Sequence, residues 1–274
     1  MRNNFYQKSP LRFFLFMAVF SCLLFSEKSF SKQNLRTCML LPITDSIQGG
    51  IGFRVFEKLE LYLRDSFWCY YRPNSEIIDI LGNYHRNLNV HLKNKEVLKL
   101  LARKTKAGSL IRVELISEVT GILIKMEVIG ENGEDIYFKE RIIQKSDEID
   151  VIAQTIQNWL DVYNKTIPYD GLVVGVLGDQ FTVDMGTDYG IYNDTGVLIH
   201  RPLSKKRHPL LREIVSWEHH KIGEGIIFHA GKKQSHGRAK KYSSKRRLRL
   251  GDWVIVNRKV PEKLKGDYLV ENEE

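Results

Sequence analysis

The sequence predicts an α+β fold, in which a mixed α/β sheet domain packed with helices is followed by a small all-β barrel-like domain. Two observations predict it. Between residues 32 and 165, apolar strand-like runs alternate with stretches of helical periodicity. After Gly171 the chain holds only short β-rich runs, separated by glycine or polar turns. The polar segment 164–171 is interpreted as a linker, so the expected domains are residues 32–165 and 166–274.

The first elements are expected in the order strand, helix, strand. Residues 35–43 form a short apolar run typical of a buried strand. Residues 51–66 repeat their apolar side chains at helical spacing, and the aromatic run 67–71 is strand-like. Ser75 is expected to cap a short helix. Residues 83–94 are polar and are predicted to form a loop.

A helix over residues 95–107 is predicted next, with Gly108 as its stop. Three strands are then expected over residues 110–116, 119–129 and 136–143. The last two are joined by a hairpin turn at residues 130–133, and Ser146 is expected to cap a long helix that ends near Tyr163. In the barrel-like domain the short strands are expected over residues 172–177, 181–185, 196–200, 214–217, 225–229 and 253–256.

Residues 1–31 have the three parts of a secretory signal peptide. Basic residues precede the uninterrupted apolar run 13–25, and residues 29–31 offer a small-x-small cleavage site. The run of 13 residues is short beside the roughly 20 that a spanning helix needs. An uncleaved anchor and lipidation at Cys22 are the alternatives. The sequence therefore predicts an exported protein, periplasmic or associated with the outer membrane.

The chain that follows the signal peptide holds two cysteines, Cys38 and Cys69. Both lie in apolar runs expected to form neighbouring strands. In an oxidising compartment the two can form a disulfide, and two buried free thiols are the alternative.

The net charge of +9 is concentrated in one segment, which we expect to be a basic loop on the barrel. No acidic residue lies between Glu224 and Asp252, whereas the segment contains Lys232, Lys233, Arg238, Lys240, Lys241, Lys245, Arg246, Arg247 and Arg249. A smaller basic run precedes it at residues 205–208. Such density of positive charge attracts polyanions. For an exported protein these are anionic wall or lipid polymers and acidic protein surfaces, and no nucleic acid is expected; a merely solvated loop is the alternative.

The sequence offers no positive evidence for catalysis, so no enzyme, cofactor or metal is expected. Residues 184–187 (Asp-Met-Gly-Thr) follow an apolar run, as in aspartic proteases, but that mechanism needs a second carboxylate and the chain has no second copy of the motif. A tight turn explains the same residues. Because adjacent strand residues face opposite sides, His219 and His220 cannot both point at one ion without a bulge, and we expect exposed turn histidines there.

The C-terminal part resembles the C-terminal domain of flagellar assembly protein T over roughly residues 168–257. The likeness lies in Val-Asp-Met-Gly-Thr-Asp-Tyr-Gly-Ile at residues 183–191, in Ile-Gly-Glu-Gly-Ile-Ile at 222–227 and in Leu-Gly-Asp-Trp-Val at 250–254. In that family a second Gly-Asp often follows the first glycine turn, and residues 193–195 stand in its place here.

The N-terminal part is similar in its element order to α/β domains of periplasmic accessory proteins. These are the N-terminal domain of the translocation protein TolB, the curli secretion family and the middle domain of flagellar assembly protein T, with residues 97–113 as the supporting segment. The resemblance implies a non-enzymatic assembly or structural factor of the bacterial envelope, most simply a flagellar basal-body accessory protein with protein partners in that complex. A periplasmic module that binds anionic wall or lipid polymers through residues 232–249 is the alternative.

Overall fold

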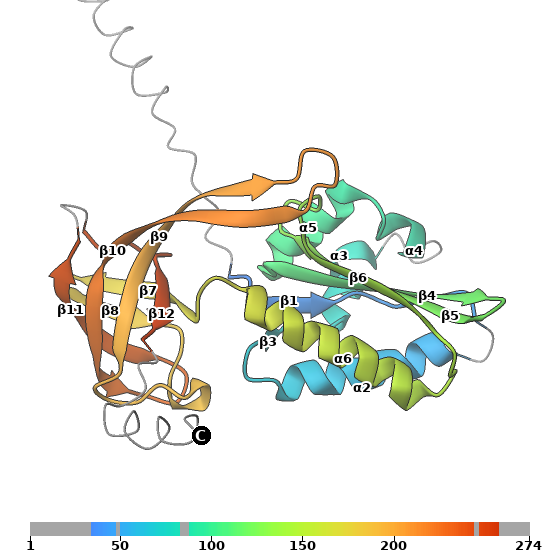
Figure 1. Ribbon diagram of the computed structural model, residues 1–274, viewed down its shortest axis with the longest axis horizontal. Coiled ribbons are helices and arrows are strands. Elements are labelled where there is room, and N and C mark those ends of the chain that lie inside the picture. Colours follow the sequence, from blue (N-terminus) through green and yellow to red (C-terminus); the bar gives the residue numbers. More distant parts are fainter. Residues whose placement is uncertain (1–33, 48–49, 83–87, 244–246, 258–274) are drawn as a thin grey trace, which may run out of the picture. The chain divides into compact units, whose positions relative to one another are not determined.

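The computed structural model describes residues 34–47, 50–82, 88–243 and 247–257. The predicted signal peptide (residues 1–31) and Cys22 lie outside these residues. Contacts divide the chain into Met1–Lys32 and the compact unit Gln33–Glu274, so the expected boundaries of the domains 32–165 and 166–274 stay predictions. The predicted α+β class is confirmed, because a mixed sheet packed with helices is followed by a closed β-barrel (Figure 1).

The sheet has the strand order β3-β1-β4-β5-β6, with β2 paired to β4. Its strands are β1 (Thr37–Leu40), β2 (Thr44–Asp45), β3 (Tyr70–Tyr71), β4 (Ser109–Glu118), β5 (Gly121–Gly130) and β6 (Ile136–Gln144). The strand β1 runs parallel to β3 and β4, and β4, β5 and β6 form an antiparallel meander. The sheet is therefore mixed, as the alternation of strands and helices followed by a meander predicts.

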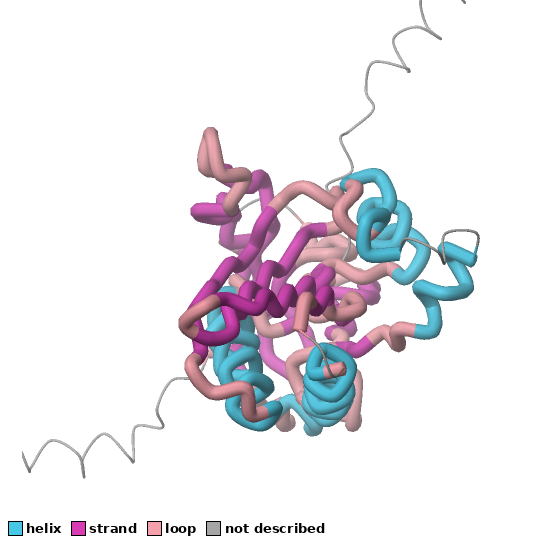
Figure 2. Tube along the Cα trace, turned by 90° about the vertical axis from the view of Figure 1, so that its right-hand side faces the viewer, coloured by secondary structure: helices cyan, strands magenta, loops and turns pink. Residues whose placement is uncertain are grey.

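Helices cover both faces of this sheet (Figures 1 and 2). The helices are α2 (Ile51–Asp65), α3 (Ser75–Leu81), α4 (Leu88–His91), α5 (Lys95–Thr105) and α6 (Ile149–Thr166). On one face α2 and α6 pack on the side chains of Cys38, Leu40 and alternate residues of β4 and β5. On the other face α3 and α5 pack on Met39 and Leu110. Successive residues of β1 thus enter opposite cores, as strand geometry requires.

Four local predictions for residues 34–166 are wrong. Ser75 is the first residue of α3 and does not cap it, because Asn74 occupies the N-cap. The expected loop 83–94 contains the helix α4 among its described residues. The helix α5 ends in a left-handed Lys106, with φ 58°, and not at Gly108. Gly108 instead permits a close approach, because a Cβ there would lie 2.3 Å from the carbonyl oxygen of Asn34. Ser146 accepts a hydrogen bond from the backbone N–H of Glu148, but it is Glu148 that occupies the N-cap of α6.

The barrel closes in the order β10-β11-β8-β7-β12-β9. Its strands are β7 (Gly171–Leu177), β8 (Gln180–Val183), β9 (Gly196–Arg207), β10 (Ile214–Ala230), β11 (Ser235–Tyr242) and β12 (Trp253–Val256). A separate apolar core fills it, with Phe181, Val183, Ile199 and Ile227 among its buried members. Two expectations need correction, since β9 and β10 are far longer than predicted and the expected basic loop 232–249 contains the strand β11.

The long ends of β9 and β10 form a two-stranded arm, which we define as residues 201–207 and 214–220 with the turn 208–213. In the described ladders these strand residues pair only with each other, whereas β12 pairs with β9 up to His200 and β11 pairs with β10 from Gly223 onward. The turn meets the sheet through a bridge between Ile136 and Glu213. Among the described residues, no helix combines the length and the hydropathy needed to cross a bilayer.

Candidate cationic surface of the barrel

The strand β11 presents its basic side chains outward. Arg238 and Lys240 are exposed, whereas the intervening Gly237 and Ala239 turn toward the barrel. Small residues are required on the inner side, since a Cβ at Gly237 would lie 2.4 Å from the ring of Phe181. Strand alternation therefore places the positive charges on the outer wall.

The backbone of β11 is paired on both sides, with β10 and with β8. Arg238 is in register with Ile226 of β10 and with Gln180 of β8. A strand held in this way keeps its outer side chains at fixed spacing along a closed wall. The charges of β11 thus belong to a structured surface, and the alternative of a solvated loop does not describe this strand.

Further basic residues extend this surface at both ends of β11. Lys232 and Lys233 are exposed in the turn before the strand, and Arg247 and Arg249 are exposed after it. The later segment is anchored, because Arg201 forms an ion pair of 2.8 Å with the buried Asp252, and Asp252 accepts a hydrogen bond from the backbone N–H of Arg249. Lys245 and Arg246 lie outside the described residues.

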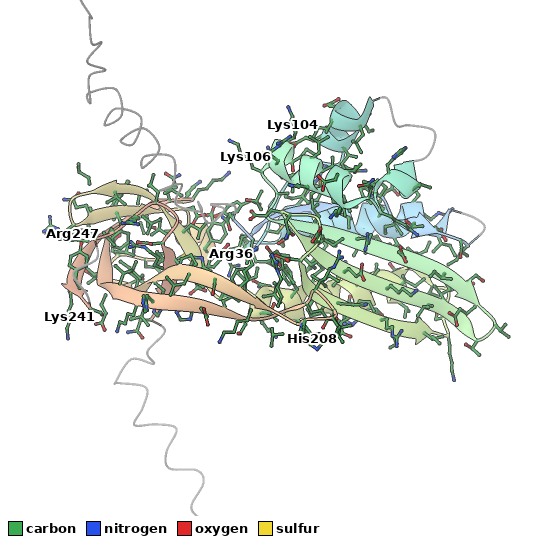
Figure 3. The ribbon with its side chains drawn as sticks, turned by 90° about the horizontal axis from the view of Figure 1, so that it is seen from above. Arg36, Lys104, Lys106, His208, Lys241 and Arg247 are labelled. Atoms are coloured by element: carbon green, nitrogen blue, oxygen red, sulfur yellow. A yellow bond between two sulfur atoms is a disulfide. The ribbon has the colours of Figure 1, made fainter. Side chains whose placement is uncertain are left out.

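We define the cationic surface as Lys232, Lys233, Arg238, Lys240, Lys241, Arg247 and Arg249. Figure 3 shows the labelled Lys241 and Arg247 at the same end of the molecule. Arg247 lies 3.3 Å from Asp179 and its guanidinium stacks over the ring of Tyr242. Burial and the hydrogen bond to Asp179 raise the pKa of Tyr242. Within the described part of the chain, the six other members have no carboxylate within salt-bridge distance.

His219 and His220 are exposed, as expected, but they lie on a strand, so the prediction of turn histidines is wrong. Both are in β10, and the Nδ1 atom of His219 is 2.8 Å from the Nδ1 atom of His200 on β9. Burial, with His219 and Lys221 nearby, lowers the pKa of His200. Among the described residues no three metal-ligating side chains converge.

Asp184, the residue that resembles a protease aspartate, is a half-buried structural acceptor. Its carboxylate accepts hydrogen bonds from the backbone N–H of Leu172 at 2.6 Å and from the side-chain amide of Asn34 at 2.7 Å. Burial raises the pKa of Asp184 to about 6, and the Leu172 N–H opposes that rise. In the next turn, a Cβ at Gly186 would lie 2.0 Å from the carbonyl oxygen of Gly231. These contacts account for the aspartate and the glycine of the motif without catalysis.

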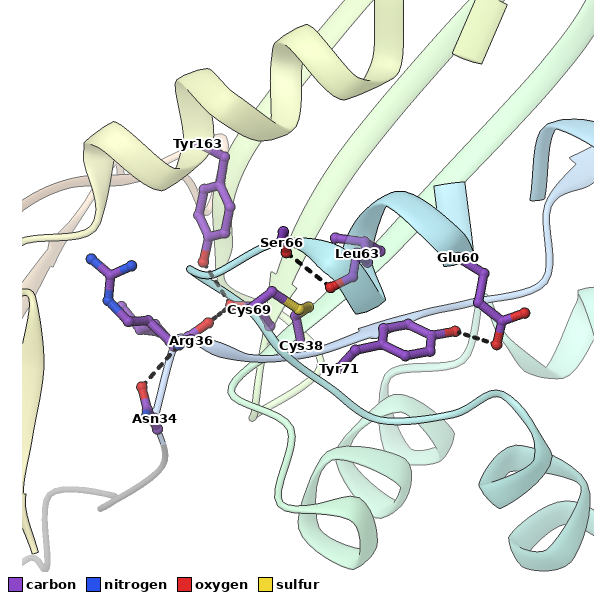
Figure 4. Close-up of a disulfide and its surroundings, with 11 residues drawn as sticks. Asn34, Arg36, Cys38, Glu60, Leu63, Ser66, Cys69, Tyr71 and Tyr163 are labelled. Carbon is purple, nitrogen blue, oxygen red and sulfur yellow. Dashed lines mark hydrogen bonds between the residues drawn. A yellow bond between two sulfur atoms is a disulfide. The ribbon is translucent and has the colours of Figure 1, made fainter. Parts of the chain in front are cut away.

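Cys38 and Cys69 form a disulfide in the structure (Figure 4). It joins β1 to the residue before β3, with the two Cα atoms 5.8 Å apart. Cys38 is fully buried and Cys69 is 6% exposed, in the core under α2 and α6. Of the two alternatives that the sequence leaves open, the structure contains the bonded one.

Sequence reasoning missed Asp135, a buried carboxylate in the β5–β6 turn that fixes the arm. Its side chain is 2% exposed and lies 2.6 Å from Arg207 and 3.4 Å from Lys205. Lys205 also lies over the rings of Tyr137 and Trp217, at 5.1 and 5.4 Å from their centroids. The basic run 205–208 is visible in the sequence, but no local sequence pattern predicts that it pairs with an aspartate some 70 residues earlier.

No family model and no curated protein matches the sequence. Solved structures give partial matches. Lipoprotein GNA1162 from Neisseria meningitidis is 9% identical, with a TM-score of 0.35 over 46% of this chain and 96% of that one. The C-terminal domains of LpoB from Salmonella enterica and Escherichia coli are 13% and 11% identical, with TM-scores of 0.32 and 0.33, over 46% of this chain and 92% and 94% of theirs. Superpositions at this level carry no functional argument, so the function is inferred from the residues of the chain itself.

Proposed function

We propose that this chain is an exported, non-enzymatic assembly or structural factor of the bacterial cell envelope. The cationic surface is the observation that carries the proposal. Six exposed basic side chains without a described carboxylate partner produce a strong positive field on a closed barrel wall. The signal-like N-terminus and the disulfide are compatible with an oxidising compartment outside the cytoplasm.

The residues that first suggest chemistry have structural roles, which supports the non-enzymatic part of the proposal. Asp184 accepts hydrogen bonds from Leu172 and Asn34, Gly186 makes room for a neighbouring carbonyl, and His219 faces His200. Charges at fixed positions on a surface attract a partner of opposite charge and orient it, without any chemical reaction.

The flagellar version of the proposal, an accessory protein of the basal body, is supported by the resemblance at residues 183–191, 222–227 and 250–254. Deletion of the gene should then impair motility, and the tagged protein should retain basal-body components in a pull-down. Full motility of the deletion strain would remove the flagellar version and leave the wider envelope role in place.

A second candidate is direct binding of anionic wall or lipid polymers, favoured by the absence of a described carboxylate within salt-bridge distance of Arg238, Lys240 and Lys241. The triple variant Arg238→Ala, Lys240→Ala, Lys241→Ala should bind dextran sulfate more weakly and with a smaller dependence on salt than the native protein. Its matched control is Arg54→Ala, Arg103→Ala, Lys104→Ala, which removes the same number of charges from exposed positions on α2 and α5. Equal binding by the two triple variants would show that net charge, and not the cationic surface, determines the affinity.

A further inference from the structure

The turn of the β9–β10 arm exposes an apolar tip. Leu210 is 84% exposed and Leu211 is 52% exposed, and Val215 on the following strand is 68% exposed. A single exposed leucine is ordinary on a protein surface, whereas adjacent large apolar side chains at the end of a two-stranded arm form a patch. The tip therefore needs an explanation other than packing within the chain.

The tip is a formed turn whose backbone groups have partners. The backbone N–H groups of Leu210 and Leu211 donate to the Nδ1 atom of His208, at 3.3 and 3.2 Å. The backbone N–H of His208 donates to the carbonyl of Glu213 at 2.7 Å, and the carbonyl of Arg212 accepts from Ile136. Since the turn is held from both ends, the two leucines are presented outward at little further cost in conformational entropy.

Basic residues flank the leucines on both strands of the arm. Lys206 and Arg207 precede the turn, with their side chains 62% and 55% exposed, and Arg212 is exposed within it. Lys206 pairs with Glu218 at 3.0 Å and Arg207 pairs with Asp135, so Arg212 is the cation beside the leucines that has no described ion pair. Exposed leucines bordered by cations match the chemistry of a membrane interface, where apolar side chains enter the acyl region and cations meet anionic head groups.

The strand β10 connects the arm to the cationic surface. The strand β10 runs from the tip into the barrel, where it pairs with β11. In Figure 3 the labelled His208 and Lys241 lie along the same, lower side of the molecule. The strand β10 thus links the tip directly to β11, which carries Arg238, Lys240 and Lys241.

We propose that the anionic partner of this protein is a phospholipid bilayer, into which Leu210 and Leu211 insert while the cationic surface rests on the head groups. This inference rests on the proposed docking role of the cationic surface and adds the identity of what is docked. The leucines distinguish a bilayer from a soluble polyanion, because a soluble polyanion offers them no apolar phase whereas a bilayer removes them from water.

Flotation with two kinds of vesicle tests the proposal. The native protein should bind vesicles of phosphatidylethanolamine and phosphatidylglycerol, and should bind vesicles of phosphatidylcholine alone much more weakly. The variant Leu210→Ser, Leu211→Ser should bind the anionic vesicles at least about tenfold more weakly, because burial of each leucine favours the bound state. The matched control Val119→Ser removes a fully exposed apolar residue from the β4–β5 turn and should bind like the native protein.

Two further measurements separate this inference from the proposed function. The leucine variant should retain native binding to dextran sulfate. The triple variant of β11 should bind both dextran sulfate and vesicles more weakly, with a loss of about fivefold in vesicle affinity for each removed charge. In a Leu210→Trp variant, anionic vesicles should shift the added indole fluorescence to shorter wavelength. Native vesicle binding by the leucine variant, or an unshifted indole, overturns the insertion. If the triple variant retains its affinity for dextran sulfate, the docking role proposed for the cationic surface is itself wrong.

Discussion

Removal of the disulfide gives the most quantitative prediction about stability. In the double variant Cys38→Ala, Cys69→Ala the unfolded chain regains the freedom of a loop whose ends are 31 residues apart. The loop-entropy relation gives a loss of about 3.7 kcal/mol in the free energy of unfolding for a loop of that length. A small further loss is expected because both sulfur atoms leave a buried position under α2 and α6.

Urea denaturation of protein that begins at residue 32 measures this loss, since Cys22 is then absent. The native protein under reducing conditions should unfold at nearly the same urea concentration as the double variant, and the double variant should not respond to reductant. An unchanged unfolding midpoint after reductant has freed both thiols of the native protein would contradict a stabilising disulfide. Two free thiols in a titration of the native oxidised protein would contradict the disulfide itself.

Three other predictions concern residues that contact segments distant in the sequence. Asp135→Asn leaves Arg207 without its carboxylate. Because Arg207 is half exposed, we expect the free energy of unfolding, measured by urea denaturation, to fall by about 2 kcal/mol. Hydrogen exchange in the arm should also become faster. Gly186→Ala forces a Cβ against the carbonyl of Gly231. The substitution should lower the free energy of unfolding by about 3 kcal/mol, measured as a lower Tm. The folded-state pKa of Asp184, about 6 against 3.8 in a free chain, means that the folded protein holds a proton that the unfolded chain has lost between these values. Stability should therefore fall as pH rises through that window, by up to about 3 kcal/mol, and Asp184→Asn should flatten this slope in thermal scans.

The elements that the sequence predicts well carry their signal in apolar periodicity. The helices α2 and α6 bury one stripe on the sheet, so the spacing of residues such as Val55, Leu59 and Ile156 is sufficient to find them. Gly108 does not mark the end of α5, as a glycine after a helix usually does, because it makes space for the carbonyl of Asn34. A close approach between distant segments leaves the same residue in the sequence as a turn does.

The strand β11 was not predictable because its inner face carries almost no apolar area. Phe181 of β8 fills the space beneath it, so only small residues such as Gly237 and Ala239 fit, and the outward residues are charged. The sequence of the strand therefore looks like a polar loop, although barrel closure makes it a strand. The basic character of the surface follows from composition alone, whereas its rigidity and the pairing of Arg207 with Asp135 depend on tertiary contacts that no local pattern encodes.

The central claim is that the cationic surface docks an anionic partner. It is tested most directly by the affinity of the triple variant Arg238→Ala, Lys240→Ala, Lys241→Ala for an anionic ligand, measured beside the helix control Arg54→Ala, Arg103→Ala, Lys104→Ala. These six side chains are all exposed, so both variants should keep a native Tm. We expect dextran sulfate binding to fall by at least about fivefold in the β11 variant and to stay near the native value in the control. Equal affinities for the two variants would contradict it.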